Sequence, residues 1–330
     1  MVKKVSVLVA VHNCAEWLPR CLNSLCTQSY GNVEVICADD ASVDGSSAII
    51  DEYAEKYNFV KKVTLATNSG PAVARNEAFR VSTGDYITMV DSDDWLSSDA
   101  LEQAVKVLDK YADTASVLFR MLYHDATTGA ESEFEKRCTA DVLDGTEAMR
   151  LALDWDIHGL YVARRRLYEK FPFDTASFLY SDDNTARRHY LHSGKVRFCD
   201  GKYYYFQRTG SLMHNPGIHY ADWMEATASL KQMLIDESQP DAYINHIEER
   251  LWQNIVAVAG YYWRYGHTLT KQQQSSLLVR IKKHHAAVEL HRLRRPFKQK
   301  FGFIPFKCSF SLFMIQARIY FYLRKAIKGI

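Results

Sequence analysis

Short apolar runs alternate with helix-like segments along the first third of the chain. Polar or turn-forming residues bound each of these runs, which occupy residues 5–11, 33–38, 60–66 and 86–90. Between the runs, apolar residues recur at helical spacing, as they do from Leu18 to Leu25. This alternation predicts an α/β fold with a mostly parallel sheet and helices on both faces, because parallel strands need crossover connections.

The pattern changes twice further along the chain. Residues 116–208 mix short apolar runs with turns and end in a strand-like segment at 202–207, and we interpret them as the second half of the same domain. Beyond Pro216, apolar residues fall at helical spacing as far as Val258, and Gly266 favours the end of that helix. The sequence therefore predicts an α/β domain over residues 1–215 and a helical C-terminal region over 216–330.

Length and composition indicate how large a core the protein can bury and in which cellular compartment it is expected. With 330 residues, 47% of them hydrophobic, the chain can bury a full core. Its seven cysteines form no CxxC pair, and no apolar stretch at the start is long enough for a signal peptide. We therefore expect a cytoplasmic protein in a reducing compartment.

Charge is distributed unevenly. From Arg280 onward there are 13 Lys and Arg against one acid, Glu289, which leaves 28 basic and 38 acidic residues upstream. In this tail, cations alternate with large apolar residues, and the apolar runs fall short of the ~18–20 residues that cross a bilayer. The pattern predicts a basic amphipathic tail on an anionic membrane surface. The alternative is a helical cap packed back onto the protein, and the absence of a reading motif argues against a nucleic-acid partner.

Two acidic clusters follow predicted strands. Asp39 and Asp40 come after the second strand, and the segment 91–94, which contains three carboxylates, comes after the fourth. Ligands of open parallel sheets bind at the carboxyl ends of the strands, so both clusters should face one crevice. Neighbouring carboxylates repel unless a cation or a set of donors compensates, and Mg²⁺ or Mn²⁺ suits oxygen ligands. The alternative is an acidic first turn of the next helix, formed by Asp94 and Asp99.

Five segments occur in an order that resembles a known family. They are VSVLVAVHN (5–13), CLNSLCTQ (21–28), DDASVD (39–44), GPAVARN (70–76) and DSDDW (91–95). Together they are similar to the inverting family-2 glycosyltransferases with the GT-A fold, of the bacterial surface-glycan type. The resemblance implies an inverting hexosyltransferase that moves a sugar from a UDP-sugar to an acceptor hydroxyl with a divalent cation, Mn²⁺ or Mg²⁺. It further implies a role in cell-surface polysaccharide or lipooligosaccharide synthesis, with a glycan or lipid-linked glycan acceptor. The basic tail would place the protein within reach of such an acceptor, at the inner face of the cell membrane.

The resemblance also implies roles on the donor side. Asp40 would accept a hydrogen bond from the uracil base, with Ala10 and His12 lining the base pocket. His12 stands where the family usually has tyrosine, and a plain surface histidine is the alternative. Arg75 would contact the donor, or else form a buried pair with Asp39.

The remaining site residues come from the same resemblance. Asp91 and Ser92 would bind the donor, and Asp93 would hold the metal. His214 would be a further metal ligand or a phosphate contact, with a plain loop histidine as the alternative.

One acid is expected to carry the proton transfer. The segment YSDD (180–183), followed by Arg187 and Arg188, resembles the Glu-Asp pair of the family, with Asp182 in place of Glu. Asp183 would then be the catalytic base, and a helix N-terminal cap is the alternative. The segment 159–165 departs from the family pattern on the acceptor side.

Other classes fit the sequence less well. A nucleotidyltransferase or a dehydrogenase would need a glycine-rich loop after the first strand, where this chain has Ala10-Val11-His12-Asn13. A non-catalytic relative that binds sugar nucleotides or membranes stays open, and it would bind donor without transferring or hydrolysing it.

Overall fold

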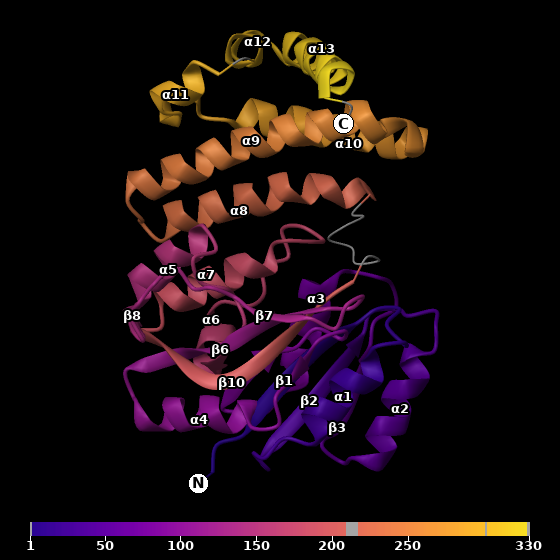
Figure 1. The fold of residues 1–330 in the computed structure, drawn as a ribbon, viewed down its shortest axis with the longest axis vertical. Helices are drawn as coiled ribbons and strands as arrows, with labels where there is room; N and C mark the ends of the chain where they lie inside the picture. Colours follow the sequence, from indigo (N-terminus) through magenta and orange to yellow (C-terminus); the bar gives the residue numbers. More distant parts are fainter. Residues whose placement is uncertain (1, 209–216, 301, 329–330) are drawn as a thin grey trace. The chain divides into compact units, whose positions relative to one another are not determined.

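The computed structural model describes residues 2–208, 217–300 and 302–328 (Figure 1). The chain divides into two compact units. The sheet unit comprises Met1–Phe178 and Asp182–Ser211, and the helical unit comprises Leu179–Ser181 and Leu212–Ile330. His214 lies outside the described residues.

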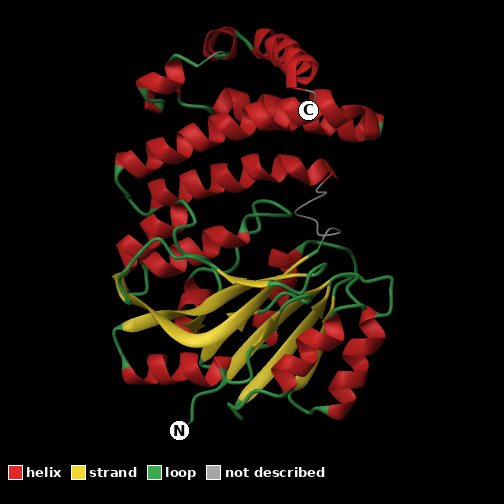
Figure 2. Cartoon of the chain, viewed as in Figure 1, coloured by secondary structure: helices red, strands yellow, loops and turns green. Residues whose placement is uncertain are grey.

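Within the described residues, ten strands form one sheet in the sheet unit (Figure 2). The spatial order is β3-β2-β1-β4-β9-β6-β10-β5, with β7 paired to β6 and β8 paired to β10. The strands are β1 (Val5–Val11), β2 (Val33–Asp39), β3 (Val60–Thr64), β4 (Tyr86–Met89), β5 (Trp95–Leu96), β6 (Thr114–Asp125), β7 (Glu131–Glu133), β8 (Val142–Asp144), β9 (Tyr161–Arg164) and β10 (Lys195–Gln207).

The first four long strands confirm the sequence prediction. β1 pairs in parallel with β2 on one side and β4 on the other, and β2 pairs in parallel with β3. β9 then runs antiparallel between β4 and β6, and β10 returns parallel to β6. The result is the predicted mostly parallel α/β sheet, with antiparallel strands in its second half.

Helices follow the strands in the expected alternation. Those of the sheet unit are α1 (Leu18–Cys26), α2 (Ser46–Lys56), α3 (Pro71–Val81), α4 (Ala100–Lys110), α5 (Gly145–Leu153), α6 (Arg165–Lys170) and α7 (Asp182–Leu191). Val5, Val7 and Val9 of β1 share a buried cluster with α1 and α4. Leu8 points to the opposite face and is also fully buried, so both faces of β1 are covered.

The described part of the helical unit consists of helices and loops (Figure 2). Its α-helices are α8 (Asp222–Asp236), α9 (Asp241–Tyr265), α10 (Lys271–Ala287), α11 (Arg295–Lys298), α12 (Phe303–Cys308) and α13 (Phe310–Lys328). Thr270 starts α10 with a reciprocal capping box to Gln273, which satisfies two backbone N–H groups at that helix end. Among the described helices, none is long and apolar enough to cross a membrane.

The basic tail is divided between the core and the surface. Phe306, Phe313 and Met314 are buried in the core of the helical unit, where they pack with residues of α9 and α10. Ile315, Ile319 and other apolar residues of α13 are instead exposed. Part of the tail is therefore a structural element of the helical unit, and the exposed part of α13 is the surface to which the membrane hypothesis applies.

Candidate donor and catalytic site

The carboxyl ends of three parallel strands meet at one edge of the sheet. Val11 of β1 is in register with Asp39 of β2, and the backbone N–H of Asp40 donates to the Val11 carbonyl at 2.8 Å. β4 pairs with β1 on the other side. His12, Asp40 and Asp91 therefore follow neighbouring strands at the same edge, as the spacing of the two acidic clusters predicts.

Asp40 is buried and holds the loop that precedes α3. Its two carboxylate oxygens accept from the backbone N–H groups of Ser69 at 2.8 Å and Gly70 at 2.7 Å. Gly70 has a φ of 92°, and a Cβ there would meet the side chain and carbonyl of Phe178 at 3.0 and 3.2 Å. The glycine is thus required both by its conformation and by close packing. A base contact by Asp40 would use the lone pairs that these two bonds leave.

His12 is exposed but fixed in orientation. Its Nδ1 lies 2.7 Å from the Asp40 carbonyl, and its Nε2 lies 3.0 Å from the side-chain amide of Asn68. Because a carbonyl can only accept, the proton belongs on Nδ1, and Nε2 then accepts from the amide. The ring is a flat plate, the shape that a base-stacking residue needs, and the half-buried Ala10 lies two residues earlier at the end of β1.

Arg75 connects the acidic turn after β4 to the N-terminus of α7. Its side chain is only 3% exposed; one terminal nitrogen donates to Asp182 at 2.8 Å, and the other pairs with Asp91. Asp39 instead accepts from the backbone N–H of Ser42 at 3.0 Å, so the alternative of a buried Arg75–Asp39 pair is wrong. Arg75 does form buried ion pairs, but it forms them with the acidic turn and with the helix that bears Asp183, and not with Asp39.

The charges of this cluster influence one another. Burial alone would lower the pKa of Arg75, but the Asp91 and Asp182 carboxylates outweigh burial and raise it above its ordinary value. Burial raises the pKa of Asp91, and Asp93 and Asp182 add to that rise, while Arg75 opposes it. Arg75 thus places a positive charge between two nearby carboxylates that would otherwise repel each other.

Asp94 ties the acidic turn to β10. One oxygen accepts from the Tyr203 hydroxyl at 2.7 Å, and the other accepts from the backbone N–H of Phe206 at 2.7 Å. Burial raises the pKa of this carboxyl well above its usual range, and Asp91 and Asp93 raise it further. Asp94 precedes β5 and not a helix, so the alternative of an acidic first helical turn is wrong for this residue.

Asp93 also has a partner that the sequence did not suggest. One of its oxygens accepts from Arg208 Nε at 3.0 Å, and the Arg208 guanidinium stacks on the Trp17 ring at 3.9 Å. The half-buried Ser92 precedes it in the same turn. Each of the three carboxylates is thus compensated by a donor: Asp91 by Arg75, Asp93 by Arg208, and Asp94 by β10. Across the described residues, no group of three or more His, Cys, Asp and Glu side chains is arranged to hold a metal ion.

Asp183 is the second residue of α7 and is partly exposed, with 29% of its side chain accessible. Burial raises its pKa to about 6, although Arg187, whose guanidinium lies 3.9 Å away, works in the opposite direction. The neighbouring Asp182 also raises this pKa and is itself held by Arg75. A carboxyl with a pKa of about 6 is deprotonated at neutral pH and can accept a proton, the property a general base requires.

Sequence reasoning missed several residues that organise this site. Tyr203 and Arg208 lie on or just after β10, and Arg20 on α1 donates to the Asp93 carbonyl at 2.7 Å. The Arg20 guanidinium also lies 3.9 Å from the Trp95 ring. The sequence offered one signal for β10, the tyrosine-rich run before Arg208, but nothing in it identifies the partners of these side chains.

Comparison with known proteins agrees with the fold. The family model for glycosyl transferase family 2 matches residues 6–174. Glycosyltransferase GlyG of Streptococcus pneumoniae is 29% identical over 229 residues, which are 64% of this chain and 74% of GlyG. Poly(ribitol-phosphate) beta-N-acetylglucosaminyltransferase TarS of Staphylococcus aureus is 26% identical over 261 residues, which are 74% of this chain and 43% of TarS.

A solved structure supports the same fold. Residues 1–349 of S. aureus TarS, crystallised in complex with UDP-GlcNAc, superpose with a TM-score of 0.72 and 18% sequence identity, covering 99% of this chain and 92% of that one. The likeness confirms the fold class, and the family model covers more than half of the chain. The motifs, the sheet and the matched family model agree: the chain belongs to glycosyl transferase family 2.

Proposed function

We propose that this protein transfers a sugar from a UDP-sugar to an acceptor hydroxyl with inversion at the anomeric carbon. The observation that carries the proposal is the Arg75 bridge, which joins the acidic turn at Asp91 to the helix that bears Asp183. A donor-side group and a candidate base with a pKa of about 6 are thereby fixed within one unit. The family membership and the TarS complex with UDP-GlcNAc support a UDP-sugar as donor.

In this reaction, Asp183 removes the proton from the acceptor hydroxyl as that oxygen attacks the anomeric carbon. The new C–O bond forms as the bond to the diphosphate oxygen breaks on the opposite face, so the configuration inverts and UDP leaves with the electron pair. The proton stays on the Asp183 carboxyl until the product departs. A positioned base of this kind contributes about 10²–10⁴-fold to the rate.

The donor side would be bound at the edge of β1, β2 and β4. The His12 ring and Ala10 would line the face of the uracil, Asp40 would accept from the base, and Asp91 with Ser92 would contact the donor beyond it. The fixed ring of His12 and the buried carboxylate of Asp40 are already held by hydrogen bonds, so little reorganisation is needed on binding.

Asp93 fits a divalent cation as a single carboxylate ligand. Among the described residues, Arg208 is its side-chain partner and contacts one oxygen, which leaves the other oxygen for a cation. Mg²⁺ and Mn²⁺ commonly take one or two carboxylates and complete their shells with phosphate and water oxygens. A bound cation would supply positive charge for the departing diphosphate. We keep His214 as a proposed further ligand or phosphate contact.

The alternative of a non-catalytic relative makes a different prediction. Such a protein would bind a UDP-sugar but would not cleave it to release UDP. Screening a panel of UDP-sugars for thermal stabilisation and slow UDP release separates the two, because hydrolysis needs no knowledge of the acceptor. Stabilisation without UDP release from any donor in the panel would favour the non-catalytic relative.

We also propose that residues 1–215 form the catalytic domain and that residues 216–330 carry an attachment surface for the inner face of the cell membrane. α13 exposes Leu312, Ile315, Ile319, Tyr322 and Leu323. It carries cations and no acid, so its charge complements an anionic leaflet. An acceptor in surface-glycan synthesis, if linked to lipid, would lie at that leaflet.

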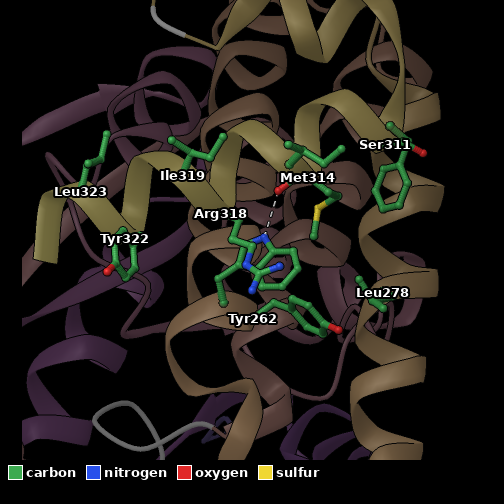
Figure 3. A pocket seen from close by; sticks show the side chains of 11 residues that line it. Tyr262, Leu278, Ser311, Met314, Arg318, Ile319, Tyr322 and Leu323 are labelled. Atoms are coloured by element: carbon green, nitrogen blue, oxygen red, sulfur yellow. Dashed lines mark hydrogen bonds between the residues drawn. The ribbon is translucent and has the colours of Figure 1, made fainter.

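An apolar cavity lies beside this surface (Figure 3). It has a volume of about 690 Å³ and is lined by residues of α9, α10 and α13, including Tyr262, Leu278 and Ile319. Arg318 lies 5.1 Å from the Trp263 ring, and the Trp263 indole donates to the Met314 carbonyl at 3.1 Å. A cation next to an open apolar cavity suits the interfacial region of an anionic membrane.

A further inference from the structure

Trp155 occupies a backbone position that favours glycine. It lies two residues after Leu153, the last residue of α5, and its φ is 60°. Its N–H points to the Ala152 carbonyl at 3.5 Å, and the N–H of Asp156 donates to the Leu151 carbonyl at 3.0 Å. This is the pattern of a Schellman turn, whose left-handed residue is usually glycine because a side chain there is strained. A bulky residue in this conformation marks a candidate functional position.

Packing does not explain the large side chain. Trp155 is 45% exposed, and among the large hydrophobic residues exposed in the described part of the sheet unit it is the one aromatic side chain. Burial of an indole is the usual reason for a tryptophan, and here nearly half of the residue faces solvent. The strain at Trp155 is therefore not offset by a place in the core.

The side chain of Trp155 contacts the candidate base. Arg187 of α7 donates to the Ala152 carbonyl near the end of α5 at 3.1 Å, and its guanidinium lies 3.9 Å from the Asp183 carboxyl. The Trp155 side chain, just after this helix end, lowers the pKa of Asp183 as a hydrogen-bonding neighbour, although burial outweighs it. On the neighbouring segment, Gly159 lies against the same helix, since a Cβ at this position would be 3.5 Å from Asp183 Oδ1 and 3.2 Å from the Ala186 Cβ. An exposed indole and an accessible carboxylate thus lie together on one surface of the sheet unit.

We propose that Trp155 is the platform on which a sugar ring of the acceptor stacks, and that its indole N–H also orients the Asp183 carboxylate. This inference rests on the proposed function, because it assigns the acceptor side of the same site. A pyranose has an apolar face of C–H groups and a rim of hydroxyls. The indole offers a flat apolar face with one polar edge, which matches that shape at little conformational cost. A ring seated there would present a hydroxyl to Asp183.

The test compares Trp155→Gly and Trp155→Phe with the parent protein. Three quantities are measured. They are the unfolding midpoint, the affinity for UDP by calorimetry, and the saturation-transfer NMR signal of methyl glycosides of glucose, galactose and N-acetylglucosamine. UDP is present in the NMR samples so that the donor side is filled. Glycine suits the left-handed turn, so Trp155→Gly should unfold at the same temperature as the parent or higher.

A platform role predicts that the parent and Trp155→Phe show saturation transfer to one face of a methyl glycoside ring. In Trp155→Gly that signal should be weaker by about tenfold, as expected from the loss of one aromatic contact face, while UDP affinity is unchanged. If Trp155 instead stabilised the fold, Trp155→Gly would unfold at a lower temperature than the parent, and that result overturns the proposal. Parent protein that binds UDP but gives no ring signal with any glycoside, or a signal of equal strength in Trp155→Gly, overturns it as well. Parent protein that does not bind UDP would overturn the proposed function instead, and this inference with it.

Discussion

Replacing Arg75 by methionine should strongly destabilise the sheet unit. Methionine matches the unbranched stem of the side chain but leaves Asp91 and Asp182 without the cation that compensates them. Removal of one partner from a buried ion pair costs about 3–5 kcal/mol. Because the two carboxylates are 39% and 29% exposed, water will offset part of this cost, and we expect a loss of about 2–4 kcal/mol.

The assay is urea unfolding of the parent and the variant, with Arg80→Met as a matched control. Arg80 lies on the same helix and is 69% exposed, and its ion-pair partner among the described residues is Glu77, so its replacement should cost less than about 0.5 kcal/mol. Arg75→Lys should fall between the two, because lysine restores the charge but cannot bridge both carboxylates with a planar fork.

The loss should also depend on pH. Without Arg75, the pKa of Asp91 in the folded protein rises further above its unfolded value, since Arg75 is the group that lowers it. The penalty is then fully present at neutral pH and shrinks as pH falls through the raised pKa, because a protonated carboxyl needs no cation. Arg75→Met as stable as Arg80→Met at pH 7, or a loss that grows on acidification, would refute this reasoning.

Two further predictions concern the cation and the membrane. UDP should bind more tightly with Mn²⁺ than without it, and Asp93→Asn should abolish the difference; calorimetry that finds equal UDP affinity in the parent protein with and without Mn²⁺ would contradict the assignment. The parent should co-sediment with vesicles that contain phosphatidylglycerol but not with pure phosphatidylcholine, since each cation near an anionic leaflet contributes about 1 kcal/mol. Ile319→Glu on α13 should reduce sedimentation, and Ile235→Glu on α8 is the control. Point substitutions are needed because truncation before Arg280 would remove part of α10 and of the core. Parent protein that ignores the anionic vesicles at low salt would refute the membrane proposal.

The first part of the fold could be predicted because its signals are local. β1 was expected over residues 5–11 and spans them, since a strand covered on both faces reads as a continuous apolar run. β3 ends at Thr64, two residues earlier than predicted, at a half-exposed strand end with mixed composition.

The second half of the sheet was less visible. β10 was predicted over 202–207 but begins at Lys195, because a register shift between Phe198 and Lys202 breaks its alternating pattern. β9 enters between β4 and β6 although it follows both in the chain, and local patterns do not specify such an order.

The site shows the same limit. The motifs identified the candidate acids, but Asp182 lies 107 residues from Arg75, and a bare sequence does not show that they meet. The composition of the tail likewise did not distinguish Phe306 and Phe313, which are buried, from Ile315, which is exposed. Burial depends on which helix faces meet, and this is a property of the assembled helical unit.

The most direct test of the account is the rate of UDP release from a UDP-sugar by the parent protein and by Asp183→Asn. The parent rate should fall as pH drops through about 6, where the base becomes protonated. Asp183→Asn should keep its affinity for UDP and lose about 10²–10⁴-fold in rate, since an amide of nearly the same shape cannot accept the proton. A variant that binds UDP and turns over at more than about a tenth of the parent rate, well short of the factor for a general base, would show that another residue is the base.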